Sequence, residues 1–436
     1  MIAGYVKDTL ALLRTRTAAQ TGAVTAGTMT SAGLRLLLML VLADALAPHE
    51  LGALVVFIAL MDVGAIACES GLNAVLVRYV AARPDRRPSD IVLRCLGIKL
   101  ALCGVVIAVL AAVYPVFISN PKIPADYAVL YPVAVASAIF LSFNTFVMAI
   151  SQSRGRYAHY AFQAALINAL RLVVLAVMLQ RGVRDAKLIC LVFFAVPPVA
   201  VAVGLAFVRA ALRGTQGLAP QNVPVKELVS FMLPLALLQV IVVITMRVDV
   251  IMLQAMTDWD VVGNYGLAYQ VAYALPLLAG ALFTVLLPKV SAMRTPEELA
   301  AYRKKVLHVY PLVLIASAAG ILIGPPIITL LFADKYAAAL PIVRLNILNF
   351  GIYSIVNPLA LIFYSLKLPY RLVALHVVQL LVLVPLNWLL IPRFQGLGPA
   401  MAVTVISVLG IAAIIPMTGA AIRRFAAGNT TRTETS

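Results

Sequence analysis

Eight charged side chains stand within long apolar stretches of this sequence, and they are the residues at which chemistry could occur. An ionisable group in an apolar, membrane-like setting costs several kcal/mol, so such a residue is a functional candidate by default. Bases outnumber acids in this set, which favours an anionic ligand. The eight are Arg35, Lys99, Arg171, Arg247 and Arg344, with Asp62, Glu69 and Asp249.

Four arginines are the predicted substrate-binding residues. Arg35 and Arg247 come first, because they occupy nearly equivalent positions when the two halves of the chain are aligned at an offset of 211 residues. A guanidinium group binds phosphate oxygens bidentately, so one arginine from each half could hold a diphosphate. Arg171 and Arg344 are weaker candidates. The alternatives are a structural hydrogen bond to a carbonyl for Arg171 and snorkelling for Lys99, which lies near a span end.

The three acids are the predicted ion-coupling residues. Asp62 and Glu69 are seven residues apart, nearly two helical turns, so they share one face of a helix. A carboxyl group in a low-dielectric setting can carry a proton, and Asp249 could act in the same way. The alternative is that all three form salt bridges with the intramembrane arginines. We expect no cofactor and no metal site, and coupling to a proton or a sodium gradient stays open.

Composition places these charges in a membrane. The 436 residues are 63% hydrophobic and 12% charged, whereas soluble domains average about 45–50% and about 25%. The mean hydropathy is +1.01 and the net charge is +17. We interpret the excess of base as basic loops beside a membrane and expect no nucleic-acid partner. The sequence therefore predicts an all-α, polytopic membrane protein.

Twelve spans of about 20 or more residues are predicted. We group them in two six-helix lobes, 22–212 and 229–422, joined by a cytoplasmic linker at 213–228. Residues 1–21 are a cytoplasmic segment, and 423–436 a disordered cytoplasmic tail. The predicted spans are 22–46, 51–77, 91–118, 128–150, 161–180, 188–209, 229–255, 262–288, 306–333, 338–364, 371–392 and 397–422.

An internal repeat supports the two lobes. At the offset of 211, LADALAPHELGAL around Gly52 matches LQAMTDWDVVGNY around Gly263, and Pro115 matches Pro326. Six spans in each half give both halves the same orientation. We expect two pseudo-symmetric lobes around a central cavity, because such lobes commonly form transporters that alternate the access to a central site.

Lysine and arginine placement predicts the orientation. With a cytoplasmic N-terminus, 23 of the 34 Lys and Arg residues fall in cytoplasmic segments, six in outer loops and five within spans. Both termini are therefore predicted to be cytoplasmic.

Several motifs, taken in order, give a more specific indication. They are HELGAL and SGLNAVLVRYVA after the first span, SQSRGRY after the fourth, MRVDVIMLQ and VVGNYGLAYQ, LFADKYAAALPIVRLN, and LNWLLIPRFQGLGPAMA. With them the chain resembles the polysaccharide transporters of the multidrug/oligosaccharidyl-lipid/polysaccharide exporter superfamily, the Wzx-like flippases. The resemblance covers nearly the whole chain. It implies a multi-pass protein of the bacterial inner membrane.

The resemblance implies transport of an undecaprenyl-diphosphate-linked oligosaccharide, an O-antigen or exopolysaccharide repeat unit, by alternating access. The implied partners are that lipid-linked oligosaccharide, membrane lipid, a polysaccharide polymerase and a chain-length regulator. Alternatives are a lipid II flippase, a multidrug exporter of the same superfamily and, less favoured, a membrane glycosyltransferase or polymerase. No GxxxxGK[ST] or HExxH motif occurs, and outer loops are short, so we expect a transporter that is not an enzyme.

Overall fold

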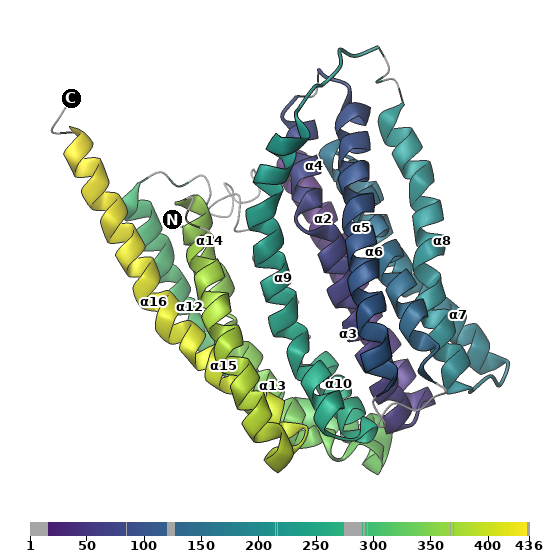
Figure 1. The fold of residues 1–436 in the computed structure, drawn as a ribbon. Coiled ribbons are helices and arrows are strands. Elements are labelled where there is room, and N and C mark those ends of the chain that lie inside the picture. The colour runs from purple at the N-terminus through teal and green to yellow at the C-terminus, as the bar shows by residue number, and fades with distance from the viewer. Residues whose placement is uncertain are drawn as a thin grey trace. The chain divides into compact units, whose positions relative to one another are not determined.

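The computed structural model describes residues 16–83, 85–119, 127–213, 215, 217–273, 290, 293, 295–366, 368 and 370–433. Helices make up nearly all of these ranges (Figure 1). The apolar composition explains this, because in lipid a helix satisfies the backbone N–H and C=O groups within one segment. The predicted all-α, polytopic fold class is confirmed.

The helices follow one another with short connections. Residues 1–273 contain α2 (Arg16–Ala45), α3 (Pro48–Glu69), α4 (Leu72–Ala81), α5 (Pro88–Ile118), α6 (Leu130–Ser153), α7 (Tyr157–Gln180), α8 (Ala186–Leu212), α9 (Val225–Met256) and α10 (Trp259–Ala272). The remainder contains α12 (Pro296–Phe332), the 3-10 turn η2 (Ala333–Tyr336), α13 (Ala339–Tyr353), α14 (Val356–Ser365), α15 (Tyr370–Phe394) and α16 (Leu397–Thr433).

Eleven helices or helix pairs among the described residues are long and apolar enough to cross a membrane. They correspond in order to eleven of the twelve predicted spans. The predicted span at 262–288 begins in α10, and its residues 274–288 lie outside the described part of the chain. Helix α16 continues to Thr433 and so extends into the segment predicted as a disordered tail.

The chain divides into two compact units. The first holds Met1–Leu38 and Phe57–Val243, and the second holds Met39–Val56 and Ile244–Ser436. Three helices, α2, α3 and α9, therefore contribute to both units. Residues 39–56, which the predicted N-terminal lobe included, belong to the second unit.

In the first unit, α6 packs against α8, α4 and α7. Its core contains Leu72 and Leu76 from α4 and Phe146 from α6, all buried. The second predicted span is interrupted between α3 and α4, where Ser70 and Gly71 have φ of 41° and 74°. A Cβ added at Gly71 would lie 2.7 Å from the Cβ of Leu235 in α9, so this position requires glycine on two grounds.

The predicted linker is bound to the first unit by specific hydrogen bonds. Arg87 N donates to Ala219 O over 2.9 Å, beside the isolated parallel bridge between Arg86 and Ala219. Gln221 N donates to the Asp90 carboxylate over 2.9 Å. Helix α9 then begins at Val225, within the range predicted as linker. These contacts attach the segment before α9 to the start of α5.

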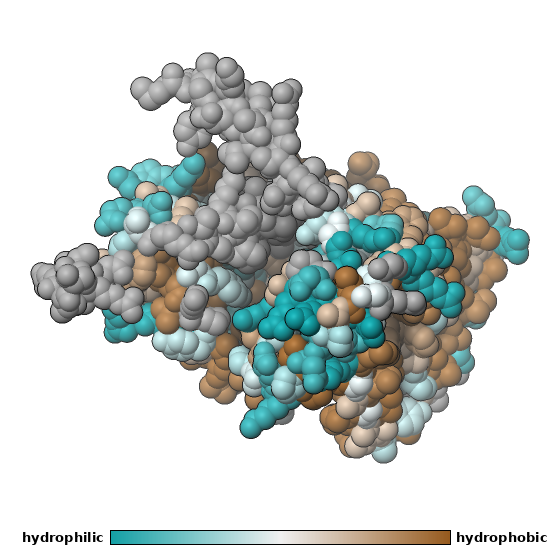
Figure 2. Space-filling view, turned by 90° about the horizontal axis from the view of Figure 1, so that it is seen from above, coloured by the Kyte–Doolittle hydropathy of each residue, from teal (hydrophilic) through white to brown (hydrophobic). Residues whose placement is uncertain are grey.

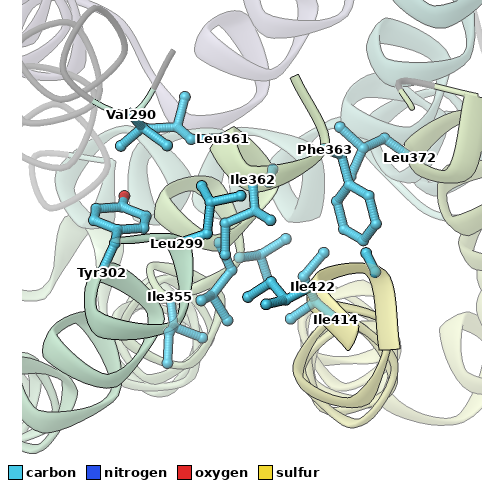
Figure 3. Packing of buried hydrophobic residues seen from close by; sticks show 14 of the residues in the cluster. Val290, Leu299, Tyr302, Ile355, Leu361, Ile362, Phe363, Leu372, Ile414 and Ile422 are labelled. Carbon is cyan, nitrogen blue, oxygen red and sulfur yellow. The ribbon is translucent and has the colours of Figure 1, made fainter. Parts of the chain in front are cut away.

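In the second unit, α12, α14, α15 and α16 enclose a cluster of buried apolar side chains (Figure 3). Leu299 from α12 and Ile362 from α14 are fully buried there, as is Ile414 from α16. The boundary between α13 and α14 lies four residues before Pro358. Proline has no N–H to donate to the carbonyl four residues earlier, which explains the interruption.

The second unit also contains a close contact between α3 and α10. A Cβ added at Gly52 would lie 2.1 Å from the Trp259 carbonyl oxygen, and one at Gly263 would lie 1.9 Å from the Pro48 carbonyl oxygen. Glycine lets two helix backbones approach this closely. The two glycines that the repeat alignment pairs therefore meet at one helix crossing.

The surface is apolar where lipid would contact it. Hydrophilic residues gather over the near end of the helices in Figure 2, and hydrophobic residues lie along their flanks. On α12, Leu322 is 76% exposed and Leu330 is 85% exposed. Such exposure of large aliphatic side chains suits a lipid solvent, which confirms a multi-pass membrane protein.

Candidate functional site

Arg35 and Asp62 form an ion pair in the first unit. The Nη2 atom of Arg35, on α2, lies 3.7 Å from Oδ2 of Asp62, on α3. The side chains are 41% and 16% exposed, so this guanidinium is accessible within its own unit. The salt bridge that the sequence left as an alternative is therefore present. Because an arginine has five N–H donors, this contact leaves donors with which Arg35 can bind an anion.

Arg171 is enclosed by its own unit. It is 7% exposed, and its Nε donates to the Phe193 carbonyl oxygen over 3.0 Å. The guanidinium carbon also lies 3.7 Å from the centroid of the Phe193 ring, a cation–π contact. Both contacts hold α7 against α8. The sequence left a hydrogen bond to a carbonyl as the structural alternative for Arg171, and this hydrogen bond is present.

Glu69 lies at the last residue of α3, beside the interruption in the second span. Thr145 on α6 donates its hydroxyl to Glu69 Oε2 over 3.1 Å. The side-chain amide of Asn73, on α4, donates to the same Thr145 hydroxyl over 3.1 Å. Asp62 and Glu69 were predicted to share a face, and the structure gives each of them a different partner.

Lys99 is fully buried, at 0% exposure, so the interpretation that it snorkels to the surface is wrong. Its Nζ donates to the hydroxyl of Ser142 and lies 3.5 Å from the Cys68 carbonyl oxygen. The side chain crosses from α5 toward α3 and α6, within the unit. The position of Lys99 near the end of an apolar stretch does not indicate that its side chain points into the unit.

Asp249 is the buried acid of the second unit, at 3% exposure on α9. Tyr265 on α10 donates its hydroxyl to Asp249 Oδ2. The other oxygen, Oδ1, accepts from the backbone N–H of Val250 over 2.8 Å. Tyr265 is itself fully buried, so its hydroxyl stabilises the carboxyl group away from solvent. Sequence reasoning missed Tyr265, because no pattern marks a tyrosine sixteen residues away.

Arg247 lies beside a group of aromatic rings in the second unit. Its guanidinium carbon is 5.9 Å from the centroid of Tyr269 on α10. Tyr269 stacks on Tyr273 with centroids 5.6 Å apart and meets Phe350 of α13 edge-on. Arg344, also on α13, is exposed. Arg35 and Arg247 belong to different units.

A protein-family model with the description "Polysaccharide biosynthesis protein" matches residues 18–294 of the chain. This range covers well over half of the sequence and contains six of the seven predicted site residues. The chain belongs to the polysaccharide biosynthesis protein family. The resemblance noted from the sequence is thereby confirmed. Among curated proteins, no sequence matches this chain.

Solved structures of transporters share the fold of this polysaccharide biosynthesis protein. The lipid II flippase MurJ in an inward closed conformation has a TM-score of 0.71 at 12% identity, covering 92% of this chain and 89% of that one. An inward-facing multidrug-resistance MATE transporter of the MOP superfamily has a TM-score of 0.68 at 17% identity, with 93% and 96% coverage.

A third structure, a MOP superfamily transporter from Pyrococcus furiosus, has a TM-score of 0.64 at 17% identity and covers 92% of this chain and 96% of that one. That transporter is described as having a binding pocket of reversed polarity. At these identities the likeness concerns the fold alone. This family member therefore shares the fold of these solved transporters.

The charged side chains of this polysaccharide biosynthesis protein fall into two groups, exposed and buried, within each unit. Arg35, Arg247 and Arg344 are at least partly exposed, whereas Arg171 and Asp249 are buried and bonded to neighbouring helices. The first three are accessible to an anion, whereas Arg171 joins α7 to α8 and Asp249 joins α9 to α10. In the described part of the chain, no three His, Cys, Asp or Glu side chains are grouped as metal ligands.

Proposed function

We propose that this chain is a flippase for an undecaprenyl-diphosphate-linked oligosaccharide, an O-antigen or exopolysaccharide repeat unit, in the bacterial inner membrane. The observation that carries the proposal is its membership of the polysaccharide biosynthesis protein family together with a transporter fold. Polysaccharide assembled outside the membrane requires that precursors built inside cross it. A polytopic fold without large extramembrane domains in its described parts suits that task.

Arg35 is the residue we expect to contact the diphosphate first. A diphosphate brings about two negative charges into a low-dielectric space, where uncompensated charge costs several kcal/mol or more. Arg35 is accessible and already binds a carboxylate, Asp62, so the exchange of one anion for another needs no new positive charge. Arg247, in the second unit, stays a prediction from the sequence for the same role.

The membrane potential could drive the export. With the inside negative, an anionic charge that moves fully outward gains roughly 2.3 kcal/mol per 100 mV. Two such charges at about 150 mV gain roughly 7 kcal/mol, which biases export without ATP. We further propose that a polymerase and a chain-length regulator receive the flipped unit at the outer face.

Purified protein in liposomes tests the proposal. A fluorescent undecaprenyl-diphosphate oligosaccharide is incorporated into both leaflets, and its outer-leaflet fraction is quenched by a membrane-impermeant reagent. We expect the protected fraction to become accessible only when the wild-type protein is present. Protein with Arg35→Ala, prepared with the same circular dichroism spectrum as the wild type, is the matched control, because it lacks one guanidinium.

The same assay separates the two transport alternatives. The fold shared with a lipid II flippase makes lipid II the second candidate substrate. Flipping of lipid II at the same rate as the oligosaccharide lipid would replace our assignment. Export of a cationic dye, with no movement of either lipid, would instead indicate a multidrug exporter.

A further inference from the structure

The interruption between α3 and α4 places a helix C-terminus inside the first unit. Gly71 N donates to the side-chain oxygen of Gln239 over 2.7 Å, which fixes the turn against α9. The C-terminus of a helix carries a partial negative charge, because its last carbonyls have no intrahelical partner. The Cys68 carbonyl is one of the groups at this end.

Oxygen atoms from three helices gather at this point. Besides the Cys68 carbonyl, they include the Glu69 carboxylate, and the hydroxyls of Ser142 and Thr145 from α6. The side-chain oxygen of Asn73, on α4, is buried without a hydrogen-bond partner. A group of carbonyl, hydroxyl and carboxylate oxygens is the environment that a hard cation requires.

The ammonium group of Lys99 occupies this environment. It donates to Ser142, faces the Cys68 carbonyl and lies 5.4 Å and 5.6 Å from the ring centroids of Phe143 and Phe146. The Glu69 carboxylate attracts it at longer range. Across the residues that the structure describes, neither Lys99 nor Glu69 forms an ion pair.

We propose that the interruption in the second span is a cation site whose resident cation is the Lys99 ammonium group, and that a sodium ion binds there when this ammonium group is removed. Membrane transporters commonly hold sodium with the carbonyls of unwound helices and with helix C-termini. Here a lysine on α5 supplies the positive charge instead. The proposal concerns this site alone and holds whichever lipid the protein carries.

Substitution of Lys99 by methionine tests the site directly. Methionine has one heavy atom fewer than lysine, so Lys99→Met removes Nζ, leaves space where it stood and leaves the surrounding oxygens in place. The readout is the midpoint of thermal unfolding of the purified full chain in sodium chloride and in choline chloride at equal ionic strength. We expect sodium to raise the midpoint of Lys99→Met by about 2–4 °C more than that of the wild type.

Two variants show whether a gain in stability arises at this site. Lys226→Met makes the same exchange at an exposed position and should respond to sodium as the wild type does. The double variant Lys99→Met, Glu69→Gln lacks the carboxylate and should lose the extra stabilisation. An equal sodium effect in Lys99→Met and wild type, or an effect that persists in the double variant, would overturn the proposal.

A variant that folds too poorly for purification is measured in isolated membranes, by the temperature at which the protein aggregates. Lys99→Gln then serves as a second neutral replacement. Aggregation temperatures of both variants that do not respond to sodium also overturn the proposal. Because these readouts involve no transported lipid, their result is independent of the flippase assignment.

Discussion

The Arg35–Asp62 ion pair suggests how an anionic substrate would be bound and released. The carboxylate neutralises the guanidinium when no substrate is present, so a diphosphate has to displace Asp62. The contact is partly exposed, so replacing Asp62 by a diphosphate costs less free energy than forming a new buried charge pair. This arrangement favours turnover over tight binding.

Removal of Arg35 and removal of Asp62 should then have opposite effects on the affinity for the diphosphate lipid. Arg35→Ala should abolish flipping, and Arg35→Lys should restore it only in part, because an ammonium group lacks the bidentate geometry. Asp62→Asn should raise the affinity for the diphosphate lipid by roughly 1.5-fold to 5-fold, as expected from a part-exposed ion pair of about 0.2–1 kcal/mol. Equilibrium binding to purified protein measures the affinity, and the liposome assay measures flipping. Unchanged binding in Arg35→Ala would assign the diphosphate to other residues.

Glu69 makes a separate prediction about coupling. Its carboxylate accepts a hydrogen bond from Thr145 and forms no ion pair among the described residues, which is a setting for proton exchange. Glu69→Gln should retain substrate binding and lose the acceleration of flipping by an imposed pH gradient. Thr145→Val tests the positioning of the carboxylate and should weaken this response only in part. Proton coupling through Glu69 is wrong if Glu69→Gln responds to the gradient as wild type does.

At this scale the sequence identified the charges but could not give their partners. Arg35, Asp62 and Asp249 stood out because each interrupts an apolar stretch. The hydroxyl donor Tyr265 and the direction of the Lys99 side chain depend on tertiary packing between helices far apart in sequence. A lysine near the end of a span snorkels to the surface only if the protein interior offers no polar group that can accept its hydrogen bonds.

At the scale of elements, glycine and proline explain two interruptions within predicted spans, at Gly71 and just before Pro358. The spans were predictable because about 20 apolar residues must cross the membrane. The interruption at Gly71 was not, since nothing in the local apolar pattern marks a positive φ there. Proline alone does not predict an interruption. Pro197 and Pro198 lie within the continuous helix α8, whereas Pro358 is the third residue of α14, just after a break.

Gly71→Ala should destabilise the first unit. The added Cβ would strain a left-handed backbone and approach Leu235, and such strain costs about 1–3 kcal/mol. Gly97→Ala is the matched control, because a Cβ at this position on α5 meets nothing within 4 Å. Unfolding midpoints in detergent provide the comparison. Equal midpoints for the two variants would show that the interruption accepts a side chain.

At the scale of the whole molecule, the distribution of basic residues predicts the orientation. A reporter fused after Ser436 should be cytoplasmic, and one inserted near Lys122, which lies outside the described residues, should be periplasmic. Alkaline phosphatase and a fluorescent protein report the two sides. A periplasmic C-terminus would remove the even number of spans and, with it, the parallel repeat.

The final prediction concerns the driving force, because net movement of charge distinguishes an electrophoretic flippase from a passive one. If the diphosphate crosses with its negative charges incompletely neutralised, a potential that is negative inside must accelerate outward flipping and slow the return. The full effect of two charges at about 150 mV is roughly 7 kcal/mol, and charges moving with the protein reduce it. In liposomes, a potassium diffusion potential of either sign can be imposed without a pH gradient. We expect the initial rate of flipping to change in opposite directions for the two signs. Rates that are equal under both potentials would mean that the diphosphate crosses together with protein charges that neutralise it. The energy for export would then have to come from ion exchange at sites such as Glu69 or Asp249.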